Sequence, residues 1–172
     1  NGTSKRSLHQ AKNGKYIRRP VSSLLGTTRV PGGKGNLSDD GTHVPLIANW
    51  PGRIRPAGVS DHLVDMSDFL PTFAELSGGK LPRGPKLDGH SFAGLLGGPG
   101  GHNRTWAYAE RGNKRFFVRT QNWKLYNNGQ LFHASRDVNE KTPIALDTAP
   151  RGAAKEIKLL QQALSTIDDG HA

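Results

Sequence analysis

The sequence predicts a protein of the α/β or α+β class, and three observations support this prediction. Apolar side chains recur at helical spacing over residues 69–76 and again over 157–167. Between these segments, short apolar runs alternate with turn residues. Asn128-Gly129 separates two of the runs, which is a strong hairpin signal. We therefore place a boundary near residue 100, with a small unit of antiparallel sheet and terminal helix behind it.

A long loop and two strands are expected before residue 66. Residues 1–31 are polar and basic, so we expect an extended surface loop, which either is simply solvated or faces an anionic substrate. Residues 43–50 form a short apolar run that ends at Pro51, which predicts a largely buried strand. Residues 62–65 predict a second, shorter strand.

The clearest helix of the first half is expected between Ser67, a suitable N-cap, and Gly78, which can end it. Its apolar side chains fall on one side, so we expect a buried face made of Phe69, Leu70, Phe73 and Leu76. Residues 77–103 are rich in glycine and proline, which predicts a connecting segment.

Four strands and a helix are expected in the second half. Apolar runs predict the strands at residues 105–110, 115–120, 123–127 and 130–134. The last helix is expected from about residue 150 to residue 167, with one apolar stripe formed by Ile157, Leu160, Leu164 and Ile167.

The charge of the chain favours an anionic partner. Its 24 lysines and arginines exceed its 14 acidic residues and give a formal net charge of +10. Such a charge suits nucleic acid, an acidic membrane surface, or sulfated and phosphorylated molecules. No run of about 20 apolar residues is present, so no membrane-spanning helix is expected. The absence of cysteine excludes disulfides, a thiolate zinc site and a cysteine nucleophile within these residues.

Lys34 is the first candidate for a functional residue, because it stands in Gly32-Gly33-Lys34-Gly35. Glycines let a backbone approach a ligand closely, and a lysine among them suits an anion. The phosphate-binding loop pattern fails, since Thr28 and Gly35 stand where it requires a glycine and a serine or threonine. No expected helix has a basic stripe and no zinc-ligand spacing is present, so nucleic acid is not the expected partner.

The residues themselves resemble a known family. The string GGKGNLSDDGTHVPLIANWPGRI, followed by VSDHLVDMSDFLPTFAELSG and LDGHSFAGLLGG, resembles the second half of the arylsulfatase-like, formylglycine-dependent sulfatases of the alkaline-phosphatase superfamily. VRTQNWKLYNNGQLFHASRD is similar to the C-terminal sheet of that family. The resemblance implies an alkaline-phosphatase-like α/β fold. Residues 1–100 would be the C-terminal part of its catalytic domain, and residues 101–172 a small C-terminal subdomain.

The resemblance implies a sulfuric ester hydrolase and gives three residues a role. Lys34 matches the lysine that contacts the substrate sulfate. Asn1 matches the asparagine of a D-N-G motif, so it is expected to supply one oxygen to a calcium ion. His43 stands where arginine is frequent; a structural ring is the favoured interpretation, and a substrate contact is the alternative. The turn Asp39-Asp40-Gly41 also departs from the commoner Glu-Gly-Gly.

The nucleophile is expected to lie upstream of this chain. Formylglycine forms from cysteine or serine in a C/S-x-P/A-x-R context, which is absent here. We therefore expect the C-terminal part of a larger enzyme, inactive without its N-terminal part. The family resemblance implies a periplasmic or secreted location. A sulfate ester is the expected substrate, and a sulfated polysaccharide is a candidate because the basic residues 5–19 suit a polyanion. A related phosphoric ester hydrolase and a non-catalytic module that binds anionic glycans are the alternatives.

Overall fold

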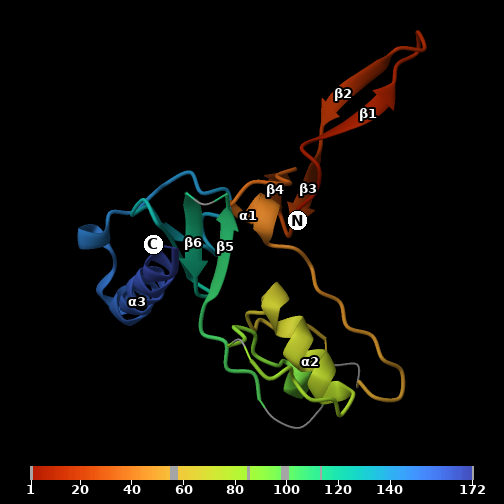
Figure 1. The fold of residues 1–172 in the computed structure, drawn as a ribbon. Coiled ribbons are helices and arrows are strands. Elements are labelled where there is room, and N and C mark those ends of the chain that lie inside the picture. The colour runs from red at the N-terminus through yellow and green to blue at the C-terminus, as the bar shows by residue number, and fades with distance from the viewer. Residues whose placement is uncertain (1, 55–57, 85, 98–100, 113, 172) are drawn as a thin grey trace. The chain divides into compact units, whose positions relative to one another are not determined.

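The computed structural model describes residues 2–54, 58–84, 86–97, 101–112 and 114–171. They form a small α/β protein with antiparallel sheets and a C-terminal helix (Figure 1). Two compact units are present: unit 1 comprises Asn1–Pro45 and Ala109–Ala172, and unit 2 comprises Leu46–Tyr108. The domain boundary expected near residue 100 stays a prediction.

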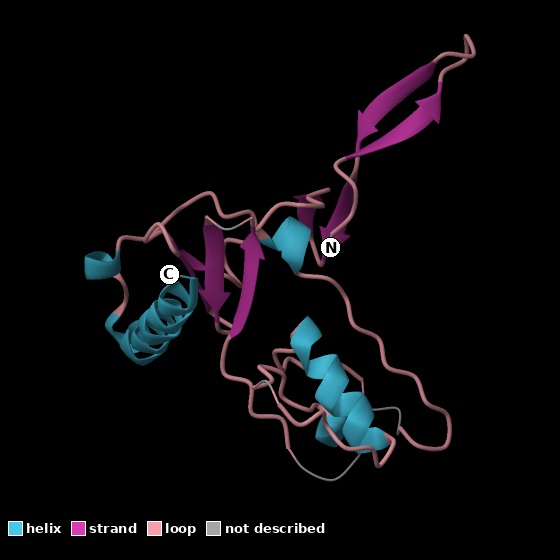
Figure 2. Ribbon diagram, in the orientation of Figure 1, coloured by secondary structure: helices cyan, strands magenta, loops and turns pink. Residues whose placement is uncertain are grey.

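Residues 1–31 contain two antiparallel hairpins, so the prediction of an extended loop is wrong (Figure 2). β1 (Arg6–Gln10) pairs with β2 (Tyr16–Pro20), and β3 (Ser22–Leu25) pairs with β4 (Thr28–Pro31). Nearly every residue of the first three strands is exposed. Because neither face of these strands is buried, their sequence has no alternation of apolar and polar residues that would reveal them.

Unit 1 is organised around a four-stranded antiparallel sheet with the strand order β5-β6-β7-β8, which confirms the four strands expected in the second half. The strands are β5 (Ala107–Arg111), β6 (Arg115–Arg119), β7 (Trp123–Tyr126) and β8 (Leu131–His133). Gly129 adopts a φ of 84° in the turn between β7 and β8, a conformation that glycine reaches without steric penalty. The hairpin expected at Asn128-Gly129 is therefore present.

The C-terminal helix covers this sheet. α3 (Ala154–His171) follows a short 3₁₀ turn, η4 (Arg151–Ala153), and packs on β6 and β7. Ile157 and Leu160 are buried, as the predicted stripe requires. Glu156, in the first turn of α3, accepts hydrogen bonds from Thr120 Oγ1 at 2.5 Å and Asn122 Nδ2 at 3.2 Å. The start of the helix is thereby fixed to the turn between the two central strands.

No strand forms over residues 43–50 or 62–65, so both of these predictions are wrong. α1 (Asp39–Thr42) ends at His43, and the chain after it is extended without a ladder partner in the described residues. Leu46 and Ile47 are 49% and 87% exposed. An apolar run becomes a strand only where another strand pairs with it, and no described segment does so here.

Unit 2 contains α2 (Phe69–Leu76), which follows the 3₁₀ turn η1 (Met66–Asp68), and the 3₁₀ turn η2 (Ala93–Leu96). The expected helix is present, but Ser67 is not its N-cap: Ser67 lies inside η1, whose N-cap is Asp65, and the N-cap of α2 is Asp68. The Asp65 carboxylate accepts from the Ser67 N–H at 2.9 Å, while Asp68 accepts from the Asp65 N–H at 2.8 Å. This reciprocal capping box satisfies two backbone donors at the start of the helix.

The buried face of α2 is not the apolar one that the sequence predicts. Leu70 and Phe73 are 52% and 60% exposed, whereas Asp68, Pro71 and Thr72 are buried. Thr72 explains the difference, because its hydroxyl donates to the Asp68 carbonyl at 2.6 Å and accepts from the Phe92 N–H at 3.0 Å. Hydrogen bonds to the following loop therefore help to orient the helix, together with the edge-on contact between Phe69 and the buried Phe92.

Asp68 joins three segments of unit 2. Arg104 donates to both of its carboxylate oxygens, from Nε at 2.7 Å and from Nη2 at 2.5 Å, and the His90 N–H donates at 2.7 Å. Burial alone would raise the pKa of Asp68, but the hydrogen bonds from Arg104 and the backbone outweigh it and lower the pKa below its usual value. The segments that contain Asp68, His90 and Arg104 are thus held together by the ionised carboxylate of Asp68.

The lowered pKa of Asp68 predicts a loss of stability in acid. In the unfolded chain this carboxyl ionises near pH 3.9, so its stabilisation is complete above about pH 4 and is lost as the pH falls through the lower folded value. We expect the urea-unfolding free energy of Asp68→Asn to decline less between pH 5 and pH 3 than that of the wild type. Asp147→Asn, at an exposed position, is the control. Equal declines in Asp68→Asn and the wild type would contradict this assignment.

Candidate functional site

Lys34 lies in the turn between β4 and α1. The turn is closed by a hydrogen bond from the Asn36 N–H to the Gly33 carbonyl at 2.7 Å, and Gly35 has a φ of 85°. The backbone N–H of Lys34 donates to the Thr3 carbonyl at 2.9 Å. Its side chain is exposed, and no described residue pairs with its ammonium. The backbone of Lys34 is therefore fixed while its charge is available to an anion.

The glycines before Lys34 are required by close packing. A Cβ atom on Gly32 would overlap the carbonyl of Ser4, and one on Gly33 would overlap the carboxylate of Asp40. That carboxylate accepts hydrogen bonds from Asn36 Nδ2 at 3.1 Å and from the hydroxyl of Ser38. Contacts on both sides of Lys34 therefore define the path of its loop.

Asp39 follows the Lys34 loop and is almost completely buried, with 6% of its surface exposed. Nη1 of Arg119 lies 3.1 Å from each of its carboxylate oxygens, and Nζ of Lys124 lies 3.2 Å from Oδ1. Burial alone would raise the pKa of Asp39. The contact with His43 and the charges of Arg119 and Lys124 outweigh burial and hold the pKa well below its usual value.

Lys124 is the centre of the contacts around Asp39, and none of its surface is exposed. Its ammonium donates to the Leu37 carbonyl at 2.7 Å, to Asp39 Oδ1 at 3.2 Å and to Glu140 Oε1 at 2.6 Å. It also lies 3.9 Å from the ring centroid of Phe117. All three of its protons have an acceptor, which is the condition under which a buried ammonium is tolerated.

Glu140 completes this arrangement from the loop after β8. Its second carboxylate oxygen accepts a hydrogen bond from the Tyr126 hydroxyl at 2.5 Å. Burial, together with the hydrogen bond to Glu140, raises the pKa of Tyr126, so the hydroxyl stays protonated and donates. Glu140 has a φ of 51°, which is uncommon for a residue other than glycine.

We call Asp39, Arg119, Lys124 and Glu140 the buried charge cluster. The cluster connects the segment after Lys34 to β6 and β7, and Leu37 in that segment packs with Phe117, Tyr126 and Phe132. Sequence reasoning missed it, although one signal was present. Lys124 is the one charged residue in Trp123-Lys124-Leu125-Tyr126, and a lysine within a buried strand requires a carboxylate partner.

His43 caps the C-terminal end of α1 and lies beside the buried charge cluster. Its backbone N–H donates to the Asp39 carbonyl at 3.0 Å, and its Nδ1 lies 3.7 Å from Asp39 Oδ2. The ring is 56% exposed. These contacts favour a structural role, and a contact between His43 and substrate stays a prediction.

Asn1, the expected calcium ligand, lies outside the described residues. Gly2, which follows it, donates to the Gly41 carbonyl at 2.8 Å. Within the described part of the chain, no group of three or more histidine or acidic side chains is placed to hold a metal ion. Asp39 and Asp40 are already engaged by protein donors. Calcium takes six or more oxygen ligands, so the described residues do not fit that ion by themselves.

Comparison with known proteins places these observations in a family. A family model described as N-sulphoglucosamine sulphohydrolase, C-terminal, matches residues 33–161. The matched range begins in the Lys34 loop and includes every member of the buried charge cluster, the sheet and part of α3.

Individual relatives agree with the family model. The chain is 40% identical over 82 residues to an ulvan-active sulfatase from Formosa agariphila. The aligned residues make up 48% of the chain and 16% of that protein. The chain is 37% identical over 99 residues to human arylsulfatase A, which covers 55% of the chain and 19% of the relative. Mouse steryl-sulfatase is 37% identical over 67 residues, 39% of the chain and 11% of the relative. The matched part thus spans about a fifth or less of these proteins.

The buried charge cluster predicts that Lys124→Met destabilises the fold. The substitution leaves Asp39 and Glu140 buried without their shared cation, so we expect the unfolding free energy to fall by about 3–5 kcal/mol. Urea unfolding followed by the fluorescence of tryptophan, with Trp123 buried in the same strand, measures the change. Lys141→Met, at an exposed position, is the control. A change below about 1 kcal/mol in Lys124→Met would mean that the cluster contributes little net stability.

Proposed function

We propose that this chain, which belongs to the family of N-sulphoglucosamine sulphohydrolase C-terminal domains, is the C-terminal part of a sulfatase. The whole enzyme would hydrolyse a sulfate ester with water, giving an alcohol and sulfate. The relatives described above are named as sulfatases, so a phosphoric ester hydrolase or a non-catalytic binding module is not favoured. The observation that best supports a catalytic contribution is the ammonium of Lys34, which pairs with none of the described residues and stands on a fixed backbone.

Lys34 would bind and orient the sulfate group of the substrate. A lysine ammonium is a compact positive charge, so it attracts the sulfate oxygens and stabilises the negative charge that develops as the S–O bond breaks. The loop does not need to reorganise during the reaction, because hydrogen bonds and close glycine packing already fix its backbone. His43 is a weaker candidate for a substrate contact, since its ring already lies beside Asp39.

The remaining catalytic groups would come from other parts of the enzyme. A formylglycine upstream would supply the nucleophile, and a calcium ion would supply positive charge beside the sulfate. Asn1 is proposed as one oxygen ligand of that ion. Two contacts hold the residues that follow Asn1 to the segment around Lys34: Gly2 donates to the Gly41 carbonyl, and the Thr3 carbonyl accepts from the Lys34 N–H. We derive no step through calcium, since the described residues do not form its site.

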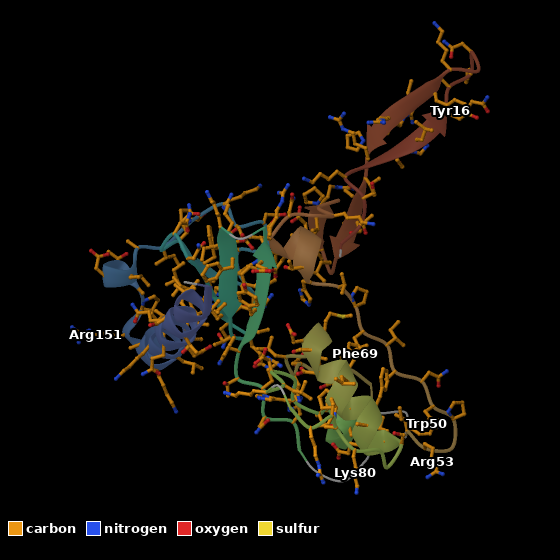
Figure 3. The ribbon with its side chains drawn as sticks, viewed as in Figure 1. Tyr16, Trp50, Arg53, Phe69, Lys80 and Arg151 are labelled. Atoms are coloured by element: carbon orange, nitrogen blue, oxygen red, sulfur yellow. The ribbon has the colours of Figure 1, made fainter. Side chains whose placement is uncertain are left out.

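The surface of unit 2 supports a place within a larger, alkaline-phosphatase-like fold. Large apolar side chains are exposed on it, and four of them line a cavity of about 490 Å³ together with the half-buried Phe69: Leu46, Ile47, Trp50 and Phe73. Figure 3 labels Phe69 on α2 and Trp50 in the preceding segment. Apolar patches of this kind are typical of surfaces that another part of a protein covers. The N-terminal part of the same enzyme is the proposed partner.

The cellular location and the substrate are proposed from the family and the charge. No helix in the residues that the structure describes has the length and apolar character to cross a membrane. We propose a periplasmic or secreted enzyme whose substrate is a sulfated polysaccharide. One relative is named for activity on ulvan, and the net charge of +10 suits a polyanionic substrate.

Lys34→Ala tests the proposed function. In the full-length protein we expect kcat/KM for a small aryl sulfate to fall by about 10²–10³, the usual effect of removing one group that stabilises a transition-state oxyanion. Lys12→Ala removes a positive charge from an exposed position in the same N-terminal region and should leave this activity unchanged. The proposed role of Lys34 would be wrong if both variants retained wild-type turnover.

A further inference from the structure

The positive charge of this chain is concentrated in its first 38 residues. This segment contains no acidic residue and eight basic ones, so it contributes +8 of the formal net charge of +10. The basic residues are Lys5, Arg6, Lys12, Lys15, Arg18, Arg19, Arg29 and Lys34. The other 134 residues hold 16 basic and 14 acidic side chains and are nearly neutral. Five of these cations belong to the strands of the β1–β2 hairpin or the turn between them.

The β1–β2 hairpin is exposed and its charges are uncompensated. All five residues of β2 and four of the five residues of β1 are exposed. No ion pair within the described part of the chain involves Arg6, Lys12, Lys15, Arg18 or Arg19. Neighbouring positive charges that lack an acidic partner repel one another, and a bound polyanion would relieve this repulsion.

The register of the hairpin determines which residues share one of its faces. Arg6 is opposite Pro20, Leu8 is opposite Arg18, and Gln10 is opposite Tyr16. These residues alternate with those of the other face, so Arg6, Arg18 and Tyr16 share one face of the ribbon. Arg6 and Arg18 are diagonal neighbours, which usually places them about 7–8 Å apart. Tyr16, labelled in Figure 3, is 66% exposed.

The base of the hairpin is connected by hydrogen bonds to the Lys34 loop. The Val21 N–H donates to the Lys5 carbonyl at 3.1 Å, and the Gly32 N–H donates to the Val21 carbonyl at 2.8 Å. The Lys34 N–H donates to the Thr3 carbonyl at 2.9 Å. The base of the hairpin is thus tied to the segment that contains Lys34, and the basic face extends from this base along the hairpin, where the four steps from Arg6 to Gln10 span about 14 Å.

We propose that this face of the β1–β2 hairpin binds a sulfated polysaccharide away from the ester that is cleaved. Arg6 and Arg18 would bind sulfate groups of the chain through their guanidinium donors, and a sugar ring would pack on Tyr16. The inference rests on the proposed function, since Lys34 would hold the sulfate that reacts. A polysaccharide is favoured over nucleic acid because the basic face leads into a loop that presents a sulfate-binding lysine.

A binding measurement on the full-length protein tests the hairpin independently of catalysis. The probes are dextran sulfate and unsulfated dextran at about 0.15 M salt, where charges more than about 8 Å apart are screened. We expect Arg6→Ser/Arg18→Ser to weaken the binding of dextran sulfate at least about tenfold. The control is Lys155→Ser/Lys158→Ser, which removes the same charge from exposed positions on α3 and should alter binding less than about twofold.

Turnover measurements and a comparison with the binding of duplex DNA distinguish the proposal from its alternatives. Unchanged aryl sulfate turnover in Arg6→Ser/Arg18→Ser, with a higher KM for a polymeric sulfate, would support the proposal. Equal losses of binding in the hairpin variant and the α3 variant would overturn it. So would duplex DNA binding as tightly as dextran sulfate, or no binding of dextran sulfate by the wild type. If the wild type bound the polymer through the hairpin but hydrolysed no aryl sulfate, the proposed function alone would fail.

Discussion

The arrangement of unit 1 depends on one buried ammonium. Lys124 reaches from β7 to the carbonyl of Leu37, a residue 87 positions earlier in the chain, and pairs with Asp39 and Glu140. A lysine without access to water is stable only when its charge and its donors are all matched. Lys124 therefore imposes a single position on three segments: the loop after Lys34, the strand β7, and the loop that follows β8.

This constraint relates the fold to the proposed chemistry. Lys34 has an exposed side chain but a backbone that contacts on both sides hold in place. A cation that stabilises a developing charge is effective when its position is set before the reaction. The buried charge cluster would supply that rigidity from the C-terminal sheet, so residues far from the substrate would affect turnover through Lys34. It also gives a physical reason for the C-terminal sheet to lie in the same chain as the loop that we propose binds sulfate.

The sequence predicted those elements whose burial leaves a periodic pattern. Ile157 and Leu160 on α3 were found because one face of the helix packs on the sheet, and the Asn128-Gly129 turn because its positive φ favours glycine. The β1–β2 hairpin was missed because it buries neither face, and the strand at residues 43–50 was wrongly expected because an apolar run alone does not specify a strand partner. Lys34 was recognisable from its glycines, whereas Asp39 and Lys124 become partners only in three dimensions.

A double-mutant cycle in the full-length protein shows whether the buried charge cluster acts through Lys34. The measured quantity is kcat/KM for an aryl sulfate in Lys34→Ala, Lys124→Met and the double variant, at a temperature where circular dichroism shows all of them folded. If it does, we expect Lys124→Met to lower kcat/KM about tenfold when Lys34 is present and hardly at all when Lys34 is replaced by alanine. An equal loss in both backgrounds would contradict it.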